Sequence, residues 1–149
     1  MKSRAILLIE DNEADATFFE RALRNGGFEN PLFIVRSAED AMSYLRGEGK
    51  YANRGGFPLP DLIVLDLTLP GKSGAEVCKW IRGIEQFRRI PIAVLGGNGS
   101  PAEEQEVRDC GANAYHLKPN SPDELQAIIN RLISFWLMGG WTQCPDRNS

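Results

Sequence analysis

Five short apolar runs recur along the chain, and each is followed by a segment with the spacing of an amphipathic helix. Runs of this length with so few polar residues are typical of strands buried on both faces of a parallel sheet. The runs are AILLI (5–9), LFIV (32–35), LIVLDL (62–67), IPIAVL (90–95) and AYHL (114–117). Their strict alternation with helices predicts right-handed crossovers and one parallel sheet with helices on both sides.

Capping residues stand where the predicted helices begin. A cap side chain accepts a hydrogen bond from a backbone amide of the first turn, which would otherwise lack a partner. The predicted caps are Asn12, Ser37, Ser100 and Ser121, and the last two are followed by proline at the first helical position. Glu103 and Glu124 stand three residues after their serines, so we expect each to complete a capping box.

The first and last predicted helices have well-defined apolar faces. In the first helix the face is Ala14, Phe18, Ala22 and Leu23; in the last it is Leu125, Ile128, Ile129, Leu132, Ile133 and Trp136. The last helix ends in ISFWLMGGW, which carries more apolar residues than a lone terminal helix needs. Two interpretations stay open with equal weight: packing on the core, or a homodimer formed through this helix.

At 149 residues the chain is long enough for one domain with its own core. The pattern predicts an α/β fold, doubly wound and flavodoxin-like, in which five βα units form three layers and the parallel sheet has the order 2-1-3-4-5. We expect the domain to span residues 1–140 and residues 141–149 to form a short C-terminal tail. The Gly- and Pro-rich segment 47–60 is the one long irregular connection, which we expect at the surface and mobile.

Composition argues against several classes of function. The net charge is −3 and the isoelectric point is near 5.2, so no basic surface for nucleic acid is expected. No apolar segment is long enough to span a bilayer or to serve as a signal peptide, so no membrane partner is predicted. Cys78, Cys110 and Cys144 are odd in number and widely spaced, which favours reduced thiols over disulfides or a zinc site. We therefore expect a cytoplasmic protein.

Carboxylates follow the first and third predicted strands, and a lysine follows the fifth. Glu10 and Asp11 end the first run, Asp66 lies in the third, and Lys118 precedes Pro119 after the fifth. In the order 2-1-3-4-5 the first and third strands are neighbours, so the three carboxylates should share one crevice at the carboxyl edge of the sheet. Their repulsion would raise their pKa values. Mg²⁺ (or Mn²⁺) is the expected cofactor because it prefers carboxylate oxygens.

Such a site has the groups that phosphoryl transfer requires. A divalent cation and the Lys118 ammonium both neutralise the charge that spreads over the oxygens of a transferring phosphoryl group. Aspartate forms acyl phosphates in several classes of enzyme, so Asp66 is the candidate nucleophile. Each of these residues alone has a simpler explanation as a turn-former or helix cap. The combination is what makes the site specific.

With these residues in view, the chain closely resembles the receiver domain of two-component response regulators, over residues 4 to about 137. The matching segments are ILLIEDNEAD, PDLIVLDLTLPGKSG, IPIAVLGG, GANAYHLKP and the closing amphipathic helix. EDNEADA and SFWL are most similar to the stand-alone bacterial regulators that accompany bacteriophytochrome kinases. The resemblance implies a phosphoacceptor signalling protein that catalyses only its own phosphorylation and dephosphorylation. Its partners would be a sensor histidine kinase, with bacteriophytochromes as candidates, and a downstream protein reached by contact.

The resemblance also implies roles for single residues. Asp66 would accept the phosphoryl group and Lys118 would contact it. The Lys118–Pro119 peptide bond would be cis, and Tyr115 falls at the position of the family's aromatic switch. The implied metal ligands are Glu10, Asp11, Asp66 and the Thr68 carbonyl.

One departure from the family lies at the end of the fourth strand. The family has Ser or Thr where this chain has Gly96, which is followed by Gly97, Asn98 and Gly99. The resemblance implies that the missing hydroxyl would bond the phosphoryl group while Tyr115 moves behind it. The glycines have two interpretations: a mobile loop whose backbone can approach an anion closely, or relaxed selection in a module that no longer switches.

Three alternative functions stay open. Gly96 favours a pseudo-receiver, a binding module in which phosphorylation is absent or uncoupled. Asp66 and Thr68 have the spacing found in Mg²⁺-dependent aspartyl-phosphate phosphatases, although those enzymes carry the motif on an early strand with a second Asp two residues on. A flavin site is the least favoured, because EDNEAD places negative charge where a phosphate would bind.

Overall fold

A computed structural model describes residues 4–137 and shows the predicted alternation of strands and helices. All strand pairs are parallel, and the sheet order is β2-β1-β3-β4-β5. The strands are β1 (Ile6–Ile9), β2 (Leu32–Val35), β3 (Leu62–Asp66), β4 (Ile92–Leu95) and β5 (Ala114–His116). The predicted fold class and strand order are therefore confirmed.

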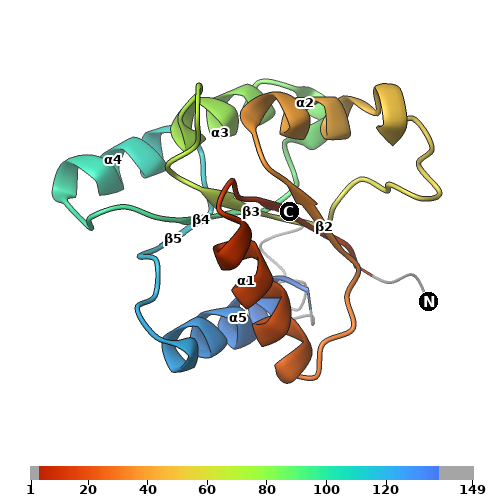
Figure 1. The fold of residues 1–149 in the computed structure, drawn as a ribbon. Helices are drawn as coiled ribbons and strands as arrows, with labels where there is room; N and C mark the ends of the chain where they lie inside the picture. Colours follow the sequence, from red (N-terminus) through yellow and green to blue (C-terminus); the bar gives the residue numbers. More distant parts are fainter. Residues whose placement is uncertain (1–3, 138–149) are drawn as a thin grey trace, which may run out of the picture.

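Five α-helices cover the two faces of the sheet. Figure 1 shows α2, α3 and α4 on one face and α1 and α5 on the other. The helices are α1 (Glu13–Asn25), α2 (Ala38–Arg46), α3 (Gly74–Arg82), α4 (Pro101–Asp109) and α5 (Pro122–Trp136), with 3-10 turns η1 (Gly49–Tyr51) and η2 (Glu85–Phe87). Among the described residues no helix is long and apolar enough to cross a membrane.

Successive strand residues point to opposite faces, so the apolar strands feed two separate cores. Leu7, Ile9 and Ile63 pack with the α2 and α3 side, whereas Ile6 and Leu8 pack with α1 and α5. This two-sided burial explains why the runs are apolar throughout rather than alternating. The rigid sheet ends between the two helical layers, where the polar residues gather.

The predicted apolar face of α1 is partly wrong. Phe18 is 52 % exposed and Ala14 is exposed, whereas Ala16 and Phe19 are buried against the sheet with Ala22 and Leu23. Two adjacent phenylalanines fit an amphipathic pattern almost equally, and the rotation of the helix on the sheet decides between them. For α5 the prediction is confirmed for Ile128, Ile129, Leu132, Ile133 and Trp136, which are buried, while Leu125 is partly buried against the same core.

Side-chain caps begin the helices as predicted: the cap oxygen accepts from the amide three residues on at Asn12, Ser37, Ser100 and Ser121. Ser73 also caps α3 and forms a capping box with Glu76, which the sequence reading did not identify. The two predicted boxes do not form. Glu124 accepts from the Asn120 amide at 2.7 Å, and Glu103 accepts from the Asn98 and Gly99 amides at 3.0 and 3.2 Å. Each carboxylate reaches past its cap to the loop before the helix.

The segment 47–60 is irregular, as predicted, but it is anchored to the core. Tyr51 is buried, and Phe57 packs edge-on against it with ring centroids 5.1 Å apart. The Arg54 guanidinium donates to the carbonyls of Tyr44 and Leu45, at 2.8 and 2.6 Å, at the end of α2. These contacts give the segment a fixed path. The predicted tail, 141–149, lies outside the described residues, so the domain boundary at 140 stays a prediction.

Candidate functional site

The three predicted carboxylates meet at the carboxyl edge of the sheet. Asp66 ends β3, and Glu10 and Asp11 directly follow the neighbouring strand β1. Carboxylate oxygens of Glu10, Asp11 and Asp66 all lie within 4.8 Å of one another. Glu10 and Asp66 are each only 4 % exposed, while Asp11 is exposed. Three carboxylates this close form a strongly anionic cluster.

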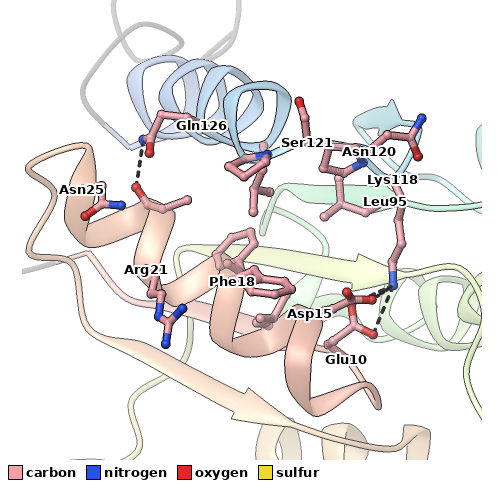
Figure 2. A pocket seen from close by; sticks show the side chains of 16 residues that line it. Glu10, Asp15, Phe18, Arg21, Asn25, Leu95, Lys118, Asn120, Ser121 and Gln126 are labelled. Atoms are coloured by element: carbon pink, nitrogen blue, oxygen red, sulfur yellow. Dashed lines mark hydrogen bonds and ion pairs between the residues drawn. The ribbon is translucent and has the colours of Figure 1, made fainter.

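Lys118 joins this cluster from the loop after β5. Its Nζ lies 3.1 Å from a Glu10 carboxylate oxygen and 3.3 Å from Asp66 Oδ2. The shortest ion pair, 2.8 Å, is with Asp15 in the first turn of α1. Figure 2 shows Lys118 pointing down between Asp15 and Glu10. The sequence reading missed Asp15, although its place four residues after Asp11, at the start of a capped helix, was an available signal.

Electrostatics in the cluster favour a cation. Burial, reinforced by the neighbouring Asp66, raises the pKa of Glu10 to about 7 although Lys118 opposes the shift. Burial by itself lowers the pKa of Lys118, but its bonds to Asp15 and Glu10 and the nearby Asp66 outweigh burial and raise it. One ammonium cannot neutralise Glu10, Asp11, Asp15 and Asp66. Oxygen donors with excess negative charge suit a hard divalent cation, so the residues present fit a metal of the Mg²⁺ class.

Backbone contacts hold the carboxylates in place. The Thr68 amide donates to Asp66 Oδ1 at 3.1 Å, and the Asn12 amide donates to Glu10 Oε2 at 3.2 Å. Gly74 closes the loop after β3 by donating from its amide to the Leu67 carbonyl at 2.8 Å. Thr68 is exposed beside the cluster, and metal binding by its carbonyl stays a prediction.

The residues expected to relay a signal lie on β5 and directly after β4. Gly96 is buried directly after β4, and its amide donates to the His116 carbonyl of β5. Tyr115 is half-buried in β5, and its hydroxyl donates to the Glu103 carboxylate. Glu103 was expected to act only as a capping residue.

The expectation of a cis Lys118–Pro119 bond is wrong. The described residues contain no cis peptide bond, so this bond is trans. Trans is the lower-energy isomer of an X–Pro bond unless its surroundings select cis, and the Lys118 side chain reaches the carboxylates without that selection.

A cavity of about 470 Å³ opens beside Lys118, between α1 and the start of α5 (Figure 2). Its walls include Phe18, Pro119 and Leu125, and Glu10, Asp15 and Lys118 line it as well. This cavity accounts for the exposure of Phe18, which faces it instead of the core.

Comparison with known proteins gives a consistent result. The sequence profile described as "Response regulator receiver domain" matches residues 6–130. The probable methanogenesis regulatory protein FilR2 of Methanothrix harundinacea is 36 % identical over 141 residues, which cover 94 % of this chain and 86 % of FilR2. Response regulator Rcp1 of Synechocystis is 33 % identical over 134 residues, which cover 90 % of this chain and 89 % of Rcp1.

Solved structures show the same likeness. The phosphorylated cyanobacterial phytochrome response regulator RcpA superposes with a TM-score of 0.83 at 37 % identity, covering 91 % of this chain and 95 % of RcpA. The Mn²⁺-bound form of Rcp1 superposes with a TM-score of 0.80 at 33 % identity, covering 90 % and 94 % of the two chains.

Proposed function

We propose, from the premise that this chain belongs to the response regulator receiver family, that Asp66 accepts a phosphoryl group from a sensor histidine kinase. The observation that carries the proposal is the convergence of Glu10, Asp11 and Asp66 within 4.8 Å, with the Lys118 ammonium 3.3 Å from Asp66. Glu10 and Asp66 both contact the lysine, and Asp66 is the one that ends the central strand β3. Its carboxylate is therefore the best placed nucleophile.

The transfer breaks the bond between phosphorus and the donor nitrogen of the kinase and forms a bond between phosphorus and an Asp66 oxygen. The Thr68 amide holds Asp66 Oδ1, so the carboxylate is oriented before the donor arrives. Lys118 places a positive charge where the phosphoryl oxygens gather negative charge. Glu10, Asp11, Asp66 and the Thr68 carbonyl would hold Mg²⁺ or Mn²⁺, which when bound supplies further charge neutralisation for the phosphoryl oxygens.

We further propose a kinase of the phytochrome class as the donor. The support is that the relatives Rcp1 and RcpA are similar over nine-tenths of this chain and that RcpA is named as a phytochrome response regulator. Signalling would follow from contact between the phosphorylated protein and a downstream protein. The cytoplasmic location and a homodimer stay predictions. Most of the apolar face of α5 is used by the core of a single chain.

The alternative of a pseudo-receiver gains no support from the described residues, since the acidic cluster and the lysine are assembled. The main support for a pseudo-receiver was the glycine at residue 96. The local packing gives another reason for a glycine at this position. A Cβ at Gly96 would lie 2.5 Å from the Leu67 Cβ, so glycine relieves a steric conflict there. The phosphatase and flavin alternatives likewise gain nothing from the family match.

Intact mass spectrometry after incubation with Mg²⁺ and acetyl phosphate tests the proposal. We expect a gain of about 80 Da, the mass of one phosphoryl group, that is abolished by chelation of the metal and by Asp66→Asn. Asp109→Asn is the matched control, because Asp109 is an exposed carboxylate whose side chain bonds Gln105 on α4, and it should be phosphorylated like the native protein. A phosphoryl gain in Asp66→Asn equal to that of the native protein would falsify the assignment.

A further inference from the structure

The glycine-rich loop between β4 and α4 is folded around a carboxylate of its own chain. The Asn98 and Gly99 amides both donate to Glu103 Oε2, at 3.0 and 3.2 Å. Gly97 and Gly99 have φ values of +66° and +71°, which side-chain-bearing residues rarely adopt. Successive amides that point at one anion form a backbone nest. Here the anion in the nest is Glu103.

Gly97 shows how closely the loop approaches this carboxylate. A Cβ at residue 97 would lie 1.9 Å from both Glu103 carboxylate oxygens, so a side chain there would have to displace this carboxylate. Glu103 itself is fixed at the third residue of α4 by its amide, which donates to Ser100 Oγ at 3.1 Å. The carboxylate is thus held from the helix side and from the loop side.

The same carboxylate oxygen also binds Tyr115. The Tyr115 hydroxyl of β5 donates to Glu103 Oε2, the acceptor of the two loop amides. One oxygen atom therefore joins three pieces of chain: the loop 97–99, the first turn of α4 and β5. A change in the position of this oxygen therefore alters contacts of all three segments.

The loop begins next to the proposed phosphoacceptor. Leu95 pairs with Asp66 in the sheet, and the Leu67 amide donates to the Leu95 carbonyl at 2.9 Å. Gly96 follows, with no room for a side chain against Leu67. No hydroxyl at residue 96 can connect the site to the loop, and the Asn98 and Gly99 amides follow two and three residues later along the chain.

We propose that Glu103 is a positioning residue that latches the 97–99 loop and Tyr115, and that a phosphoryl group on Asp66 competes with Glu103 for the loop amides. The inference rests on the proposed function of Asp66. A phosphoryl group carries more negative charge than a carboxylate, so loop amides within its reach are drawn from Glu103 toward it. Their departure leaves the Tyr115 hydroxyl as the remaining one of these three donors to Glu103 Oε2, so Glu103 and Tyr115 lose their tie to the loop. In this chain the carboxylate of α4 takes over the coupling of loop and aromatic residue that a hydroxyl at residue 96 cannot perform.

Nuclear magnetic resonance on the full chain tests the latch before phosphorylation. The signals are the amides of Asn98 and Gly99 and the ring of Tyr115. Glu103→Ala should move all three signals because it removes the acceptor. Glu103→Gln should move them less, because its amide oxygen still accepts hydrogen bonds, although more weakly than a carboxylate. Glu104→Ala is the control: Glu104 is the adjacent acidic residue, and its carboxylate pairs with Arg108 at 3.4 Å instead. If Glu104→Ala moves the three signals as much as Glu103→Ala does, the latch is overturned.

The same samples test the competition between the phosphoryl group and Glu103 for the loop amides. They are treated with Mg²⁺ and acetyl phosphate, and phosphorylation is followed by intact mass spectrometry. In the native protein, phosphorylation should move the Asn98 and Gly99 amide signals toward their positions in unphosphorylated Glu103→Ala, and the Tyr115 ring signal should move as well. Glu103→Ala should be phosphorylated faster, by about tenfold or more, because the charge-assisted hydrogen bonds of the two loop amides no longer have to be broken. A native protein that gains a phosphoryl group while the three signals stay in place overturns this inference alone. A native protein that gains no mass overturns the function of Asp66, and the competition with it.

Discussion

Asp15 forms the shortest of the three ion pairs of Lys118, and its side chain is about two-fifths exposed, whereas Glu10 and Asp66 are buried. The two buried carboxylates need compensation because burial disfavours their charged forms. Asp15 shares the ammonium with Glu10 and Asp66 and is the most exposed of the three partners. At the scale of single residues, Asp15 therefore sets how much positive charge remains inside the carboxylate cluster.

Asp15→Asn should weaken binding of Mg²⁺. Without Asp15, Lys118 stays over Glu10 and Asp66, where its charge repels the cation. We expect affinity to fall about three- to tenfold, as for one charge moved by a few ångströms at a partly exposed site. Calorimetric titration with MgCl₂ measures this. Glu13→Gln is the control, because Glu13 is in the same turn of α1 but pairs with Arg36 at 3.3 Å. Equal losses in the two variants would contradict the role of Asp15.

At the scale of elements, α3 has a glycine at each end, and only the first of them makes a close approach to the backbone. Gly74 begins the helix against the strand that carries Asp66: a Cβ there would lie 2.4 Å from the Asp66 carbonyl oxygen and 2.7 Å from the Leu67 Cα. Both atoms belong to the backbone and cannot move aside cheaply. Gly83 ends the helix with ordinary φ of −77°, and a Cβ there would meet nothing closer than 3.5 Å. The start of α3 thus fixes the loop after Asp66, while the end of the helix tolerates a side chain.

Gly74→Ala should reduce the free energy of unfolding by about 1–3 kcal/mol, because the added methyl group overpacks the backbone below Asp66. Gly83→Ala should leave it unchanged or raise it by about 0.4–1 kcal/mol, since alanine restricts the unfolded chain and fits the native backbone. Urea unfolding of both variants provides the comparison. If the two substitutions had the same effect, the close approach at Gly74 would not be what positions α3.

At the scale of the whole molecule, the sheet separates two hydrophobic layers, and the one on the α2 side contains buried phenols. Tyr44 is 1 % exposed and donates to the Pro58 carbonyl at 2.8 Å; Tyr51 is 5 % exposed and donates to Asp40 at 2.9 Å. Their ring centroids lie 4.9 Å apart, and this contact anchors the segment 47–60 to the hydrophobic layer on the α2 side. Burial raises the pKa of each tyrosine to about 12, and for Tyr51 the hydrogen-bonded Asp40 adds to the shift.

These tyrosines predict a loss of stability at alkaline pH. Their ordinary pKa is about 10, so their stabilising effect is complete below pH 10 and is lost as the pH rises from about 10 through 12. At about pH 11 the loss should be on the order of 1 kcal/mol per tyrosine. Tyr51→Phe should show a shallower decline, measured as the urea midpoint at several pH values. The raised pKa of Lys118 also makes stability fall at alkaline pH, but equally in both proteins, so the same slope in both would contradict the prediction.

The amino-acid sequence by itself determined the features that depend on neighbours along the chain. Apolar runs of four to six residues indicated the five strands, and serine and asparagine caps indicated where helices begin, because a cap bonds an amide three residues away. The order of the strands then predicted that Glu10, Asp11 and Asp66 would meet, since parallel strands end at one edge.

Only the tertiary structure decided which distant groups share an atom or a face. The rotation of α1 on the sheet chose Phe19 over Phe18 for the core and aimed Asp15 at Lys118, a residue 103 positions away. The packing of the β4–α4 loop turned Glu103 from a predicted cap into the acceptor of Tyr115 and the loop amides. Such choices depend on helix rotation and loop path, which differ by small energies among arrangements with the same local pattern, and so no spacing along the chain specifies them.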